Sequence, residues 1–169
     1  MKQPHVLFLC IVVILLDIQT GHSQSCQALF EAALTGQNSA EIRLRKINDY
    51  LYNNNCKDKR KEAFLEKGKL QDELGQIANA IESYNSAINV DRNYGSAYLY
   101  RGFSKQRLDN KDASIENDFK KAIELIKENH LIWIAFQALG EYYYEKEKYS
   151  DALLLLRKQL VKFQINMHL

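Results

Sequence analysis

Beyond residue 23 the chain has two thiols and two imidazoles, the side chains that most often act as nucleophiles, bases or zinc ligands at neutral pH: Cys26, Cys56, His130 and His168. Thiols and imidazoles become catalytic or bind metal only when partner groups stand close by, usually at recognisable spacings. The sequence contains no HExxH, CxxC, GxSxG or phosphate-binding loop. It therefore predicts no enzyme activity, no metal site and no cofactor, and we interpret His130 as a capping or surface residue.

The two cysteines are 30 residues apart, and this wide separation favours a structural bond over redox chemistry. A disulfide between Cys26 and Cys56 would close a loop of about 30 residues and contribute on the order of 3 to 4 kcal/mol. Two alternatives stay open at this point. One is a pair of free, half-buried thiols, and the other is a thiol-dependent enzyme, which would need a cysteine of lowered pKa.

The first 23 residues have the three parts of a secretory signal peptide. Lys2 supplies a positive start, an apolar run follows from Val6 to Leu16, and small residues stand at Gly21 and Ser23. Cleavage after Ser23 would give a secreted or periplasmic protein, in a compartment that permits disulfides. The alternative is a protein anchored to the membrane by an uncleaved N-terminus. Eleven apolar residues rise only about 16 Å as a helix, roughly half of a bilayer core, which disfavours spanning.

Residues 24–60 are expected to form a helical hairpin that precedes the rest of the chain. Its two helices are expected at about 27–35 and 40–53, separated by a short polar turn. Asn38 is followed three residues later by Glu41, which resembles a helix N-cap with reciprocal capping. This arrangement would bring both cysteines to the open end of the hairpin.

The chain after the hairpin repeats itself with a period of about 34 residues. Gly68 and Gly102 are 34 residues apart, as are Phe64 and Tyr98, and a third unit offset by 38 aligns Gly140 with Gly102. Apolar residues recur at helical intervals inside each unit, and no proline interrupts them. The predicted units are 61–94, 95–129 and 130–169.

This pattern resembles the tetratricopeptide repeat, a 34-residue helix-turn-helix unit that stacks into a superhelix. The aromatic, glycine and alanine positions of the first unit carry the resemblance: Phe64, Gly68, Ala80, Tyr84 and Ala87. The third unit departs from the pattern at Gln159, where a small residue is expected. The resemblance implies an all-α fold, a short solenoid of helix-turn-helix repeats preceded by the hairpin. Other helical repeats of similar length are the alternative.

In the tetratricopeptide family, the first helices of successive units line a groove that holds peptides or partner helices. Phe103, Arg107 and Tyr144 are the preferred contacts here, because aromatic residues and arginine often carry binding energy. The alternative for each candidate is packing or solvated charge. The resemblance and the helical phase together direct a mixed set of side chains toward such a groove: Leu65, Lys69, Asp72, Phe103, Gln106, Arg107, Gln137, Glu141 and Tyr144.

The last predicted helix contains four consecutive leucines, from Leu153 to Leu156. Successive residues of a helix are separated by about 100°, so these side chains cannot all face one neighbour. We therefore expect a partner surface on this helix, with Leu154 and Leu155 as candidates. Self-association through residues 149–163 is one route to covering it, and a truncated longer array is another.

The charge balance excludes one large class of partners. A formal net charge of +2 on 169 residues does not suggest a nucleic-acid binder. The sequence predicts a noncatalytic interaction module or scaffold that binds another protein or peptide in an exported compartment, with membrane contact only through an uncleaved N-terminus. The competing function is an accessory repeat subunit of a cell-envelope assembly or secretion machine.

Overall fold

The computed structural model describes residues 26–35, 38–53 and 55–167, with side chains described as far as residue 161. The predicted signal peptide, residues 1–23, lies outside these ranges. The described ranges are helical throughout apart from short connections, as the sequence predicted. Residues 26–34 form a helix, and the elements that follow are α2 (Ala40–Tyr52), α3 (Arg60–Glu73), α4 (Ile77–Val90), α5 (Gly95–Leu108), α6 (Ser114–Leu125), α7 (Asn129–Glu145) and α8 (Tyr149–Met167).

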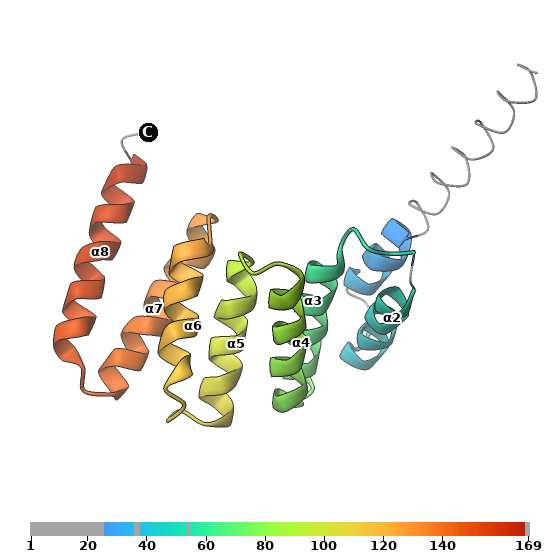
Figure 1. Cartoon of the computed structure of the whole chain (residues 1–169), viewed down its shortest axis with the longest axis horizontal. Helices are drawn as coiled ribbons and strands as arrows, with labels where there is room; N and C mark the ends of the chain where they lie inside the picture. Colours follow the sequence, from blue (N-terminus) through green and yellow to red (C-terminus); the bar gives the residue numbers. More distant parts are fainter. Residues whose placement is uncertain (1–25, 36–37, 54, 168–169) are drawn as a thin grey trace, which may run out of the picture.

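These helices form a row in which each packs against the next along the chain. Figure 1 shows this row running from the N-terminal hairpin to α8. Short connections join the successive pairs α3 with α4, α5 with α6 and α7 with α8. Among the helices described for residues 26–167, none combines the length and the apolar composition that crossing a bilayer requires.

The turn between the two helices of a unit recurs in the backbone. Gly75, between α3 and α4, has φ +73°, and Glu147, at the same place between α7 and α8, has φ 57°. In both turns the next amide donates to a carbonyl five residues back, Gln76 N to Gln71 O at 2.8 Å and Lys148 N to Tyr143 O at 2.8 Å. This is the glycine-type helix ending, which Glu147 adopts at the cost of backbone strain.

The glycines of the first two units allow the paired helices to approach closely. A Cβ on Gly102 would meet Phe119 of α6, with the ring atom Cε1 only 2.6 Å away, and a Cβ on Gly68 would collide in the same way with the ring of Tyr84 in α4. Tyr84 and Phe119 are completely buried in consequence. In the third unit the residue that faces the glycine is a leucine instead of an aromatic residue. Leu155 comes no nearer than 3.9 Å to a Cβ on Gly140, so the contact is less close.

The N-terminal hairpin caps the front of the array. Phe30, Ile47 and Tyr50 form one buried core with Ala63 and Leu70 of α3. Polar contacts strengthen the junction, since Tyr50 Oη accepts a hydrogen bond from the Lys59 amide at 3.0 Å and Arg60 donates to the Leu51 carbonyl at 3.2 Å. The structure contains the predicted Cys26–Cys56 disulfide, and Cys56 is 1% exposed.

Replacing Gly102 with alanine tests the close approach of α5 and α6. We expect Gly102→Ala to lower the free energy of unfolding by about 1 to 3 kcal/mol, because the Phe119 ring must move. Gly140→Ala is the matched control. Its Cβ fits, and alanine favours a helix over glycine by up to ~1 kcal/mol, so stability should be unchanged or raised. Equal destabilisation of both variants in urea unfolding would contradict this account.

Removing the disulfide tests the contribution of the hairpin. We expect the double variant Cys26→Ser with Cys56→Ser to lose about 3 to 4 kcal/mol of unfolding free energy, because the unfolded chain regains the freedom of a 30-residue loop. Urea unfolding of the oxidised protein and of this variant measures the difference. A variant as stable as the parent protein would show that packing alone holds the hairpin.

Candidate functional site

The first helices of the units come together on one side of the array, which we call the inner face: the exposed side of α3, α5 and α7. α3 contacts α5, and α5 contacts α7, although each pair is separated by one helix in the chain. Within the described residues these contacts are more extensive than those of α4 with α6 or of α6 with α8. Hydrogen bonds join the same helices. Arg107 of α5 reaches Asp72 of α3 at 3.3 Å, and Gln106 of α5 reaches Glu145 of α7 at 3.4 Å.

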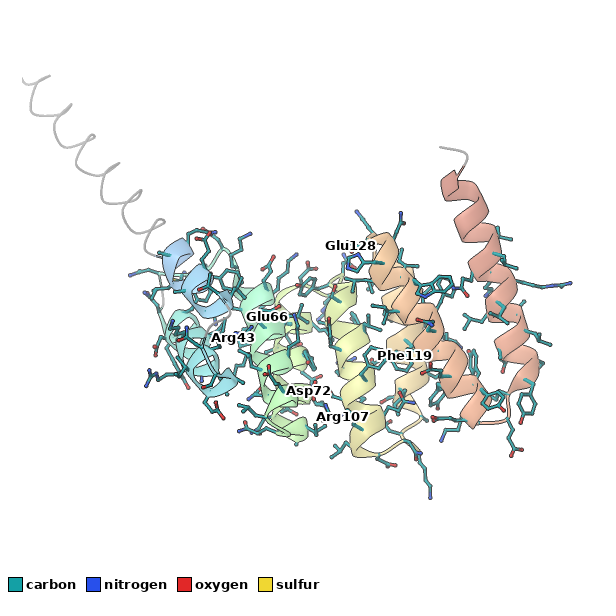
Figure 2. The ribbon with its side chains drawn as sticks, turned by 180° about the vertical axis from the view of Figure 1, so that it is seen from behind. Arg43, Glu66, Asp72, Arg107, Phe119 and Glu128 are labelled. Atoms are coloured by element: carbon teal, nitrogen blue, oxygen red, sulfur yellow. A yellow bond between two sulfur atoms is a disulfide. The ribbon has the colours of Figure 1, made fainter. Side chains whose placement is uncertain are left out.

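Asp72 connects three helices at this face. Its Oδ2 accepts hydrogen bonds from Tyr84 Oη of α4 at 2.8 Å and from Ser104 Oγ of α5 at 2.6 Å, while Arg107 bonds Oδ1. Burial raises the pKa of Tyr84 far above its usual value, and the Asp72 carboxylate adds to the shift. Asp72 is therefore occupied in holding the array together, and Figure 2 shows it beside Arg107.

The groove candidates of the first two units differ in how much surface they offer. Lys69 bonds Glu66 at 2.7 Å and lies over the Tyr100 ring, while the exposed Arg107 bonds Asp72. Phe103 is half-buried, with its ring edge-on to Phe119 at 5.4 Å. Leu65 is only 7% exposed and belongs to the core between α3 and α4, so it presents little surface to a ligand.

The groove candidates of the third unit are more open. Gln137 and Glu141 are exposed on α7. Tyr144 is 69% exposed and meets Tyr149 at the start of α8 edge-on, with ring centroids 5.8 Å apart. Gln106 is half-buried and donates to Glu145 of this unit. The described structure thus links Gln106 and Arg107 to the neighbouring first helices, whereas Gln137, Glu141 and Tyr144 line a hollow between α7 and α8.

Carboxylates that the sequence analysis did not single out complete the inner face. Glu62 and Glu66 of α3 and Glu128 at the start of α7 surround Tyr94, whose pKa is raised first by burial and then by these three charges. Oε2 of Glu62 is buried and has no hydrogen-bond partner within the described part of the chain. Helical phase could have identified the two α3 residues, because Glu62, Glu66 and Lys69 follow one another at i, i+4 and i+7.

The leucine run of α8 divides between two environments. Leu155 is 8% exposed and packs on α7, which leaves it little surface for a partner, whereas Leu154 is 52% exposed. Leu154 lines a hollow of about 540 Å³ between α6, α7 and α8, together with Ile123 and Lys158. Leu153 and Leu156 are exposed on another side of the helix.

Glu116 of α6 fastens the last unit to the array. Its carboxylate bonds Lys120 at 2.7 Å, Lys148 in the turn before α8 at 2.8 Å, and accepts a hydrogen bond from Tyr143 of α7 at 3.2 Å. The hydrogen bonds from Lys120 and then Lys148 lower the pKa of Glu116 to about 2 from its ordinary 4.5. One carboxylate therefore links α6, α7 and the base of α8.

Comparison with known proteins identifies the architecture. No protein-family model and no curated protein matches the chain. Among solved structures, the crystal structure of MamA superimposes with a TM-score of 0.71 at 15% identity, over 90% of this chain and 86% of that one. The fold is a tetratricopeptide-like helical repeat. At this identity the likeness shows the fold alone, and it confirms the all-α repeat architecture that the sequence predicted.

The tie made by Glu116 gives the tetratricopeptide-like array a defined acid sensitivity. Because the pKa of Glu116 is lower in the folded than in the unfolded chain, its stabilisation is complete above about pH 4.5 and is lost as the pH falls toward 2. We expect Glu116→Gln to be less stable than the parent at neutral pH and to show a smaller loss of stability across that window. Urea unfolding at several pH values measures both.

Glu124→Gln is the control for this titration. Glu124 pairs with Lys121 within α6 itself, so its loss leaves the base of α8 untouched. A Glu124→Gln protein with the same change in pH profile as Glu116→Gln would show that the carboxylate between α6 and α8 has no special part.

Proposed function

We propose that this protein is a noncatalytic interaction module that holds a basic segment of another polypeptide against its inner face, in an exported compartment. The observation that carries the proposal is the charge of the inner face. Its carboxylates outnumber its cations, although the whole chain has a formal net charge of +2. A repeat fold of this kind is consistent with a protein-interaction scaffold.

The cations of the inner face are already neutralised by neighbours. Lys69 is paired with Glu66, and Arg107 is paired with Asp72. This leaves carboxylates along the face that these two pairs do not balance: Glu62, Glu73, Glu128, Glu141 and Glu145. Such an excess of carboxylates attracts positively charged ligands and favours them over acidic ones.

The buried oxygen of Glu62 supports the same choice of partner. A buried carboxylate oxygen without a donor costs free energy, which an arginine or lysine of a bound segment would recover. Aromatic rings supply apolar contact between the charges. Tyr144 is largely exposed and Phe103 partly so, and aromatic side chains often carry much of the binding energy in such interfaces.

The exported location rests on two features that are independent of the groove. The Cys26–Cys56 disulfide belongs to an oxidising compartment, and the first 23 residues have the pattern of a signal peptide. We therefore propose a secreted or periplasmic protein, the alternative being attachment through the N-terminus.

Peptide display against the immobilised, disulfide-bonded protein tests the proposed function. We expect selected peptides to be rich in lysine and arginine and their affinity to fall as salt rises. Glu141→Lys should weaken binding about tenfold, equivalent to ~1.4 kcal/mol, because it places like charges together.

Glu82→Lys is the matched control for this experiment. It makes the same charge change at an exposed position of α4, on the other layer of the array. Equal weakening by both variants would show a general charge effect. Selection of acidic peptides, or of none, would overturn the proposal.

A further inference from the structure

A second apolar surface runs along α8 on the side that no described helix covers. Tyr149, Leu153, Leu156 and Leu160 follow one another at i, i+4, i+7 and i+11 and are 54%, 65%, 54% and 65% exposed. Alternating steps of four and three residues place side chains in one line along a helix, which is the pattern of a helix that pairs with another helix. We call these four residues the α8 stripe.

The first unit shows what normally covers this side of a second helix. By sequence, Leu156 and Leu160 lie 72 residues after Tyr84 and Ile88 of α4, as Gly140 lies 72 after Gly68, although Leu155 is the residue that packs over Gly140 in the structure. Tyr84 is 0% exposed and Ile88 8% exposed, because α5 packs on them and stacks Tyr100 on Tyr84 with centroids 6.1 Å apart. The stripe is therefore exposed because α8 ends the described row of helices (Figure 1).

A hollow lies beside the α8 stripe. It has a volume of about 420 Å³ between α7 and α8, with Trp133, Gly140, Tyr144 and Leu156 among its lining residues. Two positions of the first unit that correspond by sequence to its lining contact α5: Asp72 accepts a hydrogen bond from Ser104, and Tyr84 stacks on Tyr100. Gly140 leaves open space there, since a Cβ would meet only Leu155 at 3.9 Å.

We propose that the α8 stripe and this hollow bind the same surface of a second copy of the chain, giving a twofold dimer. Projecting leucines and a hollow over Gly140 lie side by side on one surface, so the surface can complement itself, as a twofold interface requires. The four stripe positions carry no charge, and the rim has both signs, Glu141 on α7 and Arg157 on α8. Net charge therefore does not oppose the pairing of two copies.

The exposed area supports the same occupant. At roughly 100 Å² for each half-exposed large side chain, the stripe with Trp133 and Tyr144 offers on the order of 600 Å² per copy. Two copies would then bury about 1,200 Å² between them, the lower edge of stable specific interfaces.

Light scattering coupled to size-exclusion chromatography tests the dimer, using the disulfide-bonded protein over a concentration series. We expect the parent protein to have twice the chain mass and Leu156→Arg to have the mass of one chain. Leu154→Arg is the matched control, because it puts the same charge at a similarly exposed position on another side of α8. It should remain dimeric.

Folding is checked separately in each variant by circular dichroism and by urea unfolding. Leu156→Ala, which adds no charge, should raise the dissociation constant of the dimer by at least about tenfold while keeping the helical signal. A parent protein that stays monomeric at about 100 μM would overturn the proposal, as would a dimer that Leu156→Arg leaves intact. Capture of a different helix by a monomeric protein would assign the surface to another partner.

Discussion

The close approach of paired helices over a glycine is the constraint on which the rest of the array depends. Phe119 lies over Gly102 and Tyr84 over Gly68, so near that a Cβ at either glycine would have to displace the ring. A bulky ring and an absent side chain are complementary, and close packing makes any change of either one costly. This pairing sets the distance between the two helices of a unit, and the spacing of the inner face follows from it.

Buried charge then fixes how successive helices are aligned. Asp118 of α6 is 1% exposed and is bonded by Arg101 and Lys105 of α5, with Lys105 Nζ 2.9 Å from its Oδ2. Removing either partner of such a buried group leaves an uncompensated charge, which is far more costly than a surface ion pair. Asp72 of α3 likewise links three helices, because it accepts hydrogen bonds from Tyr84 of α4 and from Ser104 of α5. These carboxylates make the alignment of the helices specific in a way that apolar packing alone does not.

The third unit uses different means, and its surfaces differ accordingly. Leu155 takes the place of a ring over Gly140, and no ring fills the space beside it. The unit is held instead by the Leu155 contact and by the tie from Glu116 to Lys148 and Tyr143. The less closely packed pair of α7 and α8 leaves a hollow on each side of α8. The inner face nevertheless continues from α5 to α7 through the hydrogen bond between Gln106 and Glu145. The hollows beside α8 thus arise from this difference in packing.

The sequence by itself determined the all-α repeat architecture, because the period and the helical spacing of apolar residues can be read directly from the chain. It suggested the pairing of Cys26 with Cys56 but left free thiols as an alternative, which the structure decided. Tertiary structure decided which member of each helical stripe is covered. Leu65 and Leu155 became core, and Leu153 and Leu156 were left outside, because burial depends on where the neighbouring helix ends. The acidic character of the inner face was decided in the same way, since carboxylates from α3 and from the start of α7 meet only when the helices stack.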